Sequence, residues 1–72
     1  MSIRGDERYV TVQGALKKRT DKAILIETDL GEGWVPRSCI HFMTDQAVNE
    51  MALDDEGEFR VMEWVANDRG LI

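Results

Sequence analysis

Polar and apolar residues alternate from Tyr9 onwards, with Val10, Val12 and Leu16 falling on one side of the chain. Such a period of two, with β-branched residues, is typical of a strand with one buried face. Gly14 lies on that same side, and a glycine inside a strand usually marks a bulge or a sharp bend. We therefore expect a long, bent first strand after a non-periodic lead-in over residues 1–7.

Two further strands are predicted from the apolar run at residues 23–26 and from Trp34-Val35-Pro36. Four apolar residues in a row indicate burial on both faces, so residues 23–28 should form a central strand. A charged turn over residues 17–22 precedes it, and a glycine-containing turn over residues 29–33 follows. Pro36 has no N–H to donate, which places its strand at an edge of the sheet.

The pattern changes after Pro36. Ser38 is positioned to cap the next element, and Ile40 and Phe42 are expected to re-enter the core. A helix over residues 45–53 is predicted from the apolar positions Ala47, Val48, Met51 and Ala52, with Thr44 or Asp45 as its cap.

The chain is predicted to end with a strand and a helical turn. Residues 58–62 form the strand, with Phe59 and Val61 inward, and residues 63–70 form the turn, with Gly70 just after its end. Trp64 and Leu71 are expected to fold back against the sheet.

Together these elements predict a mainly β (α+β) fold in one small domain over residues 8–72. We expect a small curved antiparallel sheet, or an SH3-like or OB-like partial barrel, with one or two short helices. A plain α+β meander with one packed helix is the alternative. So short a chain buries only about 60% of its unfolded surface, and an exposed strand edge invites pairing, so a homodimer is as compatible with the pattern as a monomer.

Charge is distributed unevenly along the chain. The net charge is −5; residues 1–44 carry seven basic and six acidic side chains, whereas residues 45–72 carry two basic and eight acidic ones. The second part therefore has a net charge of −6, which predicts one strongly negative surface. Such a surface either serves solubility or meets a partner rich in lysine and arginine.

No catalytic, metal or cofactor signature emerges from the residue types. The one cysteine, Cys39, cannot form an intrachain disulfide, and it favours a soluble, cytoplasmic protein. Ser38, His41 and Asp45 lack the flanking glycines of a nucleophile elbow, and Cys39 with His41 gives only two metal ligands. The acidic turn over residues 54–58 lacks the order of a calcium loop. We therefore expect a non-enzymatic protein without metal or cofactor.

Two binding hypotheses follow. The first is an acidic interaction module that docks on a basic protein surface, where carboxylates stand in for phosphates. Its acidic face comprises Asp45, Glu50, Asp54, Asp55, Glu56, Glu58, Glu63 and Asp68. The second is a small β-barrel that binds single-stranded nucleic acid. Its face combines a tryptophan with cations, namely Lys17, Lys18, Lys22, Trp34 and Arg37.

Three short segments resemble a group of phage and prophage proteins of unassigned function. The segments are Trp34-Val35-Pro36-Arg37-Ser38, Glu63-Trp64-Val65-Ala66 and the ending Arg69-Gly70-Leu71. The resemblance covers residues 10–40 and 61–72, and the segment 41–58 has no counterpart in it. It implies a phage-encoded accessory protein. For an acidic module, the natural target would be host nucleic-acid machinery, including a defence nuclease or a CRISPR complex; for a nucleic-acid binder, the implied role is phage replication or recombination.

Overall fold

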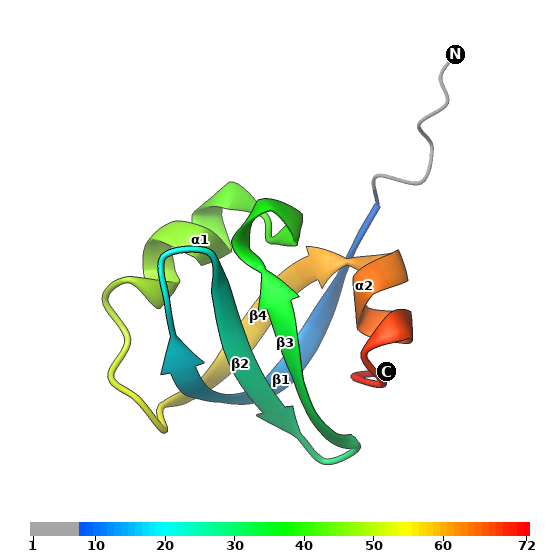
Figure 1. Cartoon of the computed structure of the whole chain (residues 1–72), viewed down its shortest axis with the longest axis horizontal. Helices are drawn as coiled ribbons and strands as arrows, with labels where there is room; N and C mark the ends of the chain where they lie inside the picture. Colours follow the sequence, from blue (N-terminus) through cyan, green and yellow to red (C-terminus); the bar gives the residue numbers. More distant parts are fainter. Residues whose placement is uncertain (1–7) are drawn as a thin grey trace.

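The computed structural model describes residues 8–72, so the predicted lead-in over residues 1–7 lies outside the described residues. Its elements are β1 (Tyr9–Arg19), β2 (Ala23–Thr28), β3 (Gly31–Pro36), the 3₁₀ turn η2 (Arg37–Cys39), α1 (Phe42–Val48), β4 (Glu56–Met62) and α2 (Glu63–Asp68). The four strands form one antiparallel open sheet in the order β3-β2-β1-β4 (Figure 1). The predicted small, mainly β sheet with short helices is confirmed. None of the helices within residues 8–72 is long and apolar enough to span a membrane.

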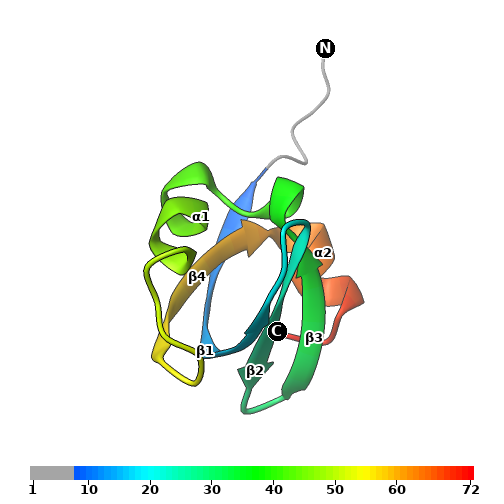
Figure 2. The same cartoon turned by 60° about the vertical axis from the view of Figure 1, so that its left-hand side comes forward.

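The sheet curves because β1 is long and changes partners along its length (Figure 2). Residues 9–15 pair with β4, whereas residues 15–19 pair with β2, with a register shift between Leu16 and Lys18. The bulge expected at Gly14 therefore lies a few residues further on. Gly14 is needed for a different reason: a Cβ there would lie 2.3 Å from the carbonyl oxygen of Glu27. The absence of a side chain lets β2 approach β1 closely at the bend.

The core fills the inner face of this curved sheet. Val12 and Leu16 of β1 lie there as predicted, and Ile24, Leu25 and Ile26 confirm a central strand buried on both faces. Phe59 and Val61 of β4 are fully buried, also as predicted. Each large aliphatic or aromatic side chain removed from water contributes about 1.5–3 kcal/mol before conformational entropy is subtracted.

The helix predicted over residues 45–53 is displaced towards the N-terminus. α1 runs over Phe42–Val48, and the Nδ1 atom of His41 caps it by accepting the Met43 N–H at 3.2 Å. Thr44, one of the two expected caps, is instead buried and accepts the Arg60 backbone N–H at 3.2 Å. Phe42, expected in the core, is 66% exposed because it begins the helix on the solvent side.

Arg19 holds the other end of α1. Its Nη1 atom donates to the carbonyl oxygens of Val48 and Met51, both at 2.7 Å. Positive charge is favourable at the C-terminal end of a helix, where carbonyl groups lack partners. The predicted charged turn is correspondingly shorter, because β1 continues through Arg19 and the reversal covers Thr20 to Lys22 only.

Both tryptophans lie on the surface, although Trp64 was expected to fold back against the sheet. Trp34 is 40% and Trp64 52% exposed. Along β3 the buried residue is Val35, so strand alternation turns Trp34 outward. In α2 the buried residues are Val65 and Ala66. The predicted return of Leu71 to the core is confirmed, and Gly70 takes a positive φ of 72° after the end of α2.

The outer strands of the sheet are partly covered along their free edges. On β3, Pro36 lacks an N–H, and the Trp34 carbonyl accepts the Arg69 Nε–H at 2.8 Å. On β4, Ile40 forms a bridge with Val61, and His41 donates its backbone N–H to the Arg60 carbonyl. The edge position predicted for Pro36 is confirmed. Ser38 does not cap the next element, since η2 has no side-chain cap.

Replacing Gly14 by alanine tests the close approach at the bend. We expect Gly14→Ala to lower the free energy of unfolding by about 2–3 kcal/mol, because β1 and β2 must separate to admit the methyl group. Gly57→Ala is the matched control: Gly57 pairs with Gly14, but its added Cβ would meet only the flexible end of Met51 at 3.5 Å. Urea denaturation of both variants measures the difference; equal losses would contradict the role of Gly14.

Candidate functional site

Half of the predicted acidic face is engaged with cations of the same chain. Asp45 accepts a hydrogen bond from Arg37 at 2.7 Å, and Asp54 accepts one from Lys17 at 2.6 Å. Glu63 lies 3.6 Å from Arg8, and Asp68 pairs with Arg69. These four carboxylates stabilise the local structure and are less free to meet a partner.

The other four predicted acids have no ion-pair partner within residues 8–72. Glu50 follows α1, and Asp55 accepts the Ala52 N–H in the loop before β4. Glu56 and Glu58 lie on β4, where both side chains are exposed. The eight predicted acids therefore divide into four that are paired and four that are unpaired in the described part of the chain.

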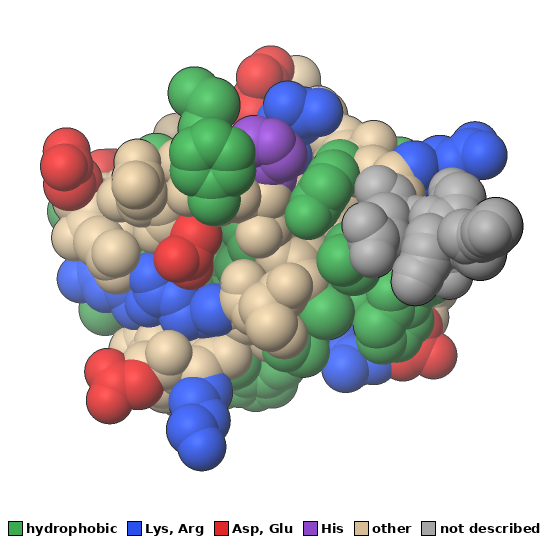
Figure 3. Space-filling view, turned by 90° about the horizontal axis from the view of Figure 1, so that it is seen from above, with side chains coloured by type: hydrophobic (Ala, Val, Ile, Leu, Met, Phe, Trp, Pro, Cys, Tyr) green, Lys and Arg blue, Asp and Glu red, His purple; other side chains and the backbone are tan. Residues whose placement is uncertain are grey.

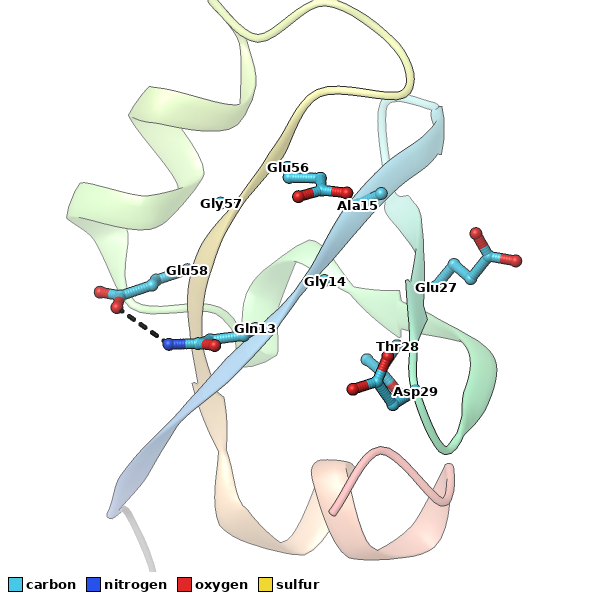
Figure 4. A pocket seen from close by; sticks show the side chains of 9 residues that line it. All are labelled: Gln13, Gly14, Ala15, Glu27, Thr28, Asp29, Glu56, Gly57 and Glu58. Carbon is cyan, nitrogen blue, oxygen red and sulfur yellow. Dashed lines mark hydrogen bonds between the residues drawn. The ribbon is translucent and has the colours of Figure 1, made fainter.

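Glu56 and Glu58 instead line a groove that also receives acids from β2 and the turn after it (Figure 4). Figure 4 shows β1 crossing the middle of this groove, with Glu56 and Glu58 on the β4 side and Glu27 and Asp29 on the other. We call this site the acidic groove. Its lining residues are Gln13, Gly14, Ala15, Glu27, Thr28, Asp29, Glu56, Gly57 and Glu58.

Strand register explains how these acids come together. Glu32, Glu27, Ala15 and Glu56 are successive cross-strand partners, one from each strand of the sheet. Glu58 is the partner of Gln13, whose side-chain amide donates to it at 3.4 Å. Gly14 pairs with Gly57, so two residues without side chains lie side by side within the groove. The acids project from the outer side of β2 and β4 and, for Asp29, from the turn after β2. Gly14 and Gly57 share their face of the sheet with inward-facing core residues, so they contribute only backbone to the groove.

The charge in the acidic groove is predominantly negative. Four carboxylates line it, and no lysine or arginine is among the lining residues. The nearest cation is Lys17, whose Nζ lies 3.8 Å from Glu27 but only 2.6 Å from Asp54. The hydrogen bond and the charge of Asp54 raise the pKa of Lys17, so its ammonium stays charged through the ordinary lysine range and loses its proton as the pH rises through the raised pKa.

The predicted nucleic-acid face is only partly available. Arg37 is largely buried, and its guanidinium donates to Asp45, the Thr20 carbonyl and Asn49. Lys17 is held by Asp54, which leaves Lys18, Lys22 and Trp34 exposed. Lys18 and Trp34 are the cross-strand partners of Leu25 on its two sides, on the outer face of the sheet. Lys18 is therefore an exposed cation in line with Trp34 across the strands.

The residues considered for catalysis or metal binding make other contacts. Ser38 Oγ lies 3.9 Å from Cys39 Sγ, His41 Nδ1 accepts the Met43 N–H, and Asp45 accepts Arg37. Within residues 8–72, no three side chains of His, Cys, Asp or Glu are arranged to hold a metal ion. The four acids of the groove are therefore spread along its walls and do not converge on one point.

Sequence reasoning missed Glu27, Asp29, Gln13 and the glycine pair as parts of a site. Glu27 and Asp29 belong to the half of the chain with a net charge near zero, so the charge distribution gave no reason to select them. The signal that identifies them is cross-strand register, which sequence periodicity alone does not define. Comparison with protein-family models, curated proteins and solved structures found no match.

Arg37 provides a test of structural against ligand-binding roles. We expect Arg37→Met to lower the free energy of unfolding by about 2 kcal/mol, because three acceptors near α1 lose a charged donor. Lys22→Met, at an exposed neighbouring cation, should change it by less than about 0.5 kcal/mol. Urea denaturation compares the two. If both variants were as stable as the parent, Arg37 would be free to act as a ligand residue.

Proposed function

We propose that this protein is a non-catalytic interaction module whose acidic groove binds a lysine- or arginine-rich segment of a partner protein. The observation that carries the proposal is the set of four carboxylates, Glu27, Asp29, Glu56 and Glu58, around a groove without a lining cation. Carboxylates accept strong, charge-assisted hydrogen bonds from ammonium and guanidinium groups. A basic segment is the ligand that this charge distribution favours.

The shape of the site supports an extended ligand. The acids come from β2, the turn after it and β4, so their separation follows the width of the sheet and does not suit a single ion. Gly14 and Gly57 line the groove with backbone alone, which a ligand can approach there. Several cations along one peptide can then meet different carboxylates.

The arrangement also carries a cost that favours a functional interpretation. Glu27 and Glu32 are direct cross-strand partners, and like charges in that position destabilise a sheet by roughly 0.2–1 kcal/mol. Departures from the stabilising choice are expected at functional sites. Lys17 Nζ, 3.8 Å from Glu27, offsets part of this repulsion. A cationic ligand beside Glu27 would offset more of it.

The class of partner follows from the same chemistry. The carboxylates of the groove can bind a basic segment that normally binds phosphates. Carboxylates and phosphates are both oxygen anions that arginine and lysine recognise. We therefore propose nucleic-acid-binding proteins as the target class, with inhibition by occupancy as the mechanism. If the phage resemblance holds, the target is a host protein of this kind, such as a CRISPR-type defence complex.

Binding of a fluorescent arginine-rich peptide (nine arginines) tests the acidic groove. We expect the affinity to fall steeply between about 50 and 200 mM salt, because the interaction is between exposed charges. Glu56→Gln with Glu58→Gln should weaken binding by about fivefold, the equivalent of roughly 1 kcal/mol from two exposed ion pairs.

The matched control is Asp21→Asn with Glu50→Gln, which changes the net charge equally at exposed positions outside the groove. Fluorescence anisotropy at one salt concentration compares the two double variants. Equal weakening would mean that net charge, and not the groove, attracts the peptide. Tighter binding of a thymidine oligonucleotide than of the peptide would favour the nucleic-acid function instead.

A further inference from the structure

A second surface lies where β1 and β4 meet the first turn of α1. The Tyr9 and His41 rings meet edge to face with centroids 5.1 Å apart, and His41 stacks on Phe42 at 4.8 Å with an interplanar angle of 27°. Figure 3 shows this histidine between hydrophobic side chains, with a cationic side chain against it. We call the surface formed by Tyr9, His41, Phe42, Met43 and Arg60 the aromatic patch.

The two large apolar side chains of the aromatic patch are strongly exposed. Phe42 is 66% and Met43 62% exposed, although a chain of this size has few large apolar residues for its core. Both lie in the first turn of α1. Clustered exposed apolar side chains mark interaction sites on soluble proteins, and Phe42 is clustered with the rings of His41 and Tyr9.

The aromatic patch is held in place by backbone contacts on both sides. His41 donates its N–H to the Arg60 carbonyl at 2.9 Å, and Thr44 Oγ1 accepts the Arg60 N–H at 3.2 Å. The His41 imidazole also caps α1 through the Met43 N–H. These bonds attach the first turn of α1 to β4, so the exposed rings are presented in one orientation. A preorganised surface loses less conformational entropy on binding.

Charge on the aromatic patch is opposite to that of the groove. Arg60 alternates with the buried Phe59 and Val61, so its side chain points to the outer face, where its cross-strand partner is Thr11. It has no anionic partner within residues 8–72. The nearby Arg8 is balanced by Glu63. The patch therefore offers two exposed apolar side chains and one positive charge.

We propose that the aromatic patch docks a partner protein segment that carries an apolar side chain next to a carboxylate. The apolar side chain would cover Phe42 and Met43, and the carboxylate would pair with Arg60. Tyrosine, phenylalanine, methionine and arginine are the residue types enriched in protein interfaces and their energetic centres. Single-stranded nucleic acid is disfavoured as the ligand. Proteins that stack bases on aromatic side chains combine them with a cationic groove, whereas this patch offers one cation.

The proposal does not depend on the acidic groove. Tyr9 lies four to six positions along β1 from the groove residues 13–15, about 13–20 Å at the usual rise of a strand. Arg60, by contrast, is two residues from Glu58 on the same face of β4, about 7 Å away. The two surfaces therefore adjoin on β4 and are apart at Tyr9, and they share no residue.

A random peptide display library selected on the full chain tests the aromatic patch. We expect recovered peptides to be enriched in large apolar residues together with Asp or Glu. Phe42→Ser should weaken their binding by about tenfold or more, and Arg60→Gln should weaken it by about fivefold. Glu56→Gln with Glu58→Gln, which tests the groove, should leave these peptides bound.

Leu30→Ser is the matched control, because Leu30 is also 66% exposed but lies in the turn between β2 and β3. It should leave binding unchanged, and urea denaturation should show all variants folded. The proposal is wrong if the recovered peptides are all basic, if none binds, or if Phe42→Ser and Leu30→Ser act equally. Concentration-dependent self-association that Phe42→Ser abolishes would also overturn it, in favour of a second copy of the chain. So would a thymidine oligonucleotide that displaces the peptides.

Discussion

The close contact between β1 and β2 at Gly14 is the constraint on which the rest of the structure depends. Because no side chain separates Gly14 from the Glu27 carbonyl, one strand can pair with β4 along its first part and with β2 along its last. This partner change curves a sheet of only four strands around a single core. The same contact brings residues 27–29 beside residues 56–58, which is where the acidic groove forms.

The distribution of charge on the surface follows from how the chain uses its own cations. Arg19 and Arg37 hold the two sides of α1, Lys17 holds the loop before β4, and Arg69 bonds to the Trp34 carbonyl of β3. These contacts attach segments that contribute few large side chains to the core. Because these cations are engaged elsewhere, Glu27 has only the longer contact to Lys17 at 3.8 Å, and Asp29, Glu56 and Glu58 have no ion-pair partner within residues 8–72.

Sequence reasoning identified the sheet well and the site poorly. Residues 23–28 were predicted with their bounds and central position, because four consecutive apolar residues leave little choice. The helix after Pro36 was misplaced because its cap is an imidazole, which is not among the usual capping side chains. Trp64 was expected against the sheet, but the residues of α2 that pack there are Val65 and Ala66.

The acidic groove could not be predicted for a related reason. Its members are up to 45 residues apart, as with Gln13 and Glu58, and they meet only through the register of β1 with two neighbours. Charge counting by segments selected the acids of residues 45–72, of which half proved to be paired internally. Periodicity therefore indicates which face a residue takes, but not which distant residue lies opposite it.

The covering of the free strand edges has a consequence for how a ligand can meet this sheet. Main-chain addition to a sheet accepts many sequences, since its hydrogen bonds do not depend on side chains. Here Pro36, Arg69 and the bridge from Ile40 to Val61 obstruct that route on both sides. A ligand of this sheet would therefore meet side chains and not a free row of backbone N–H and C=O groups.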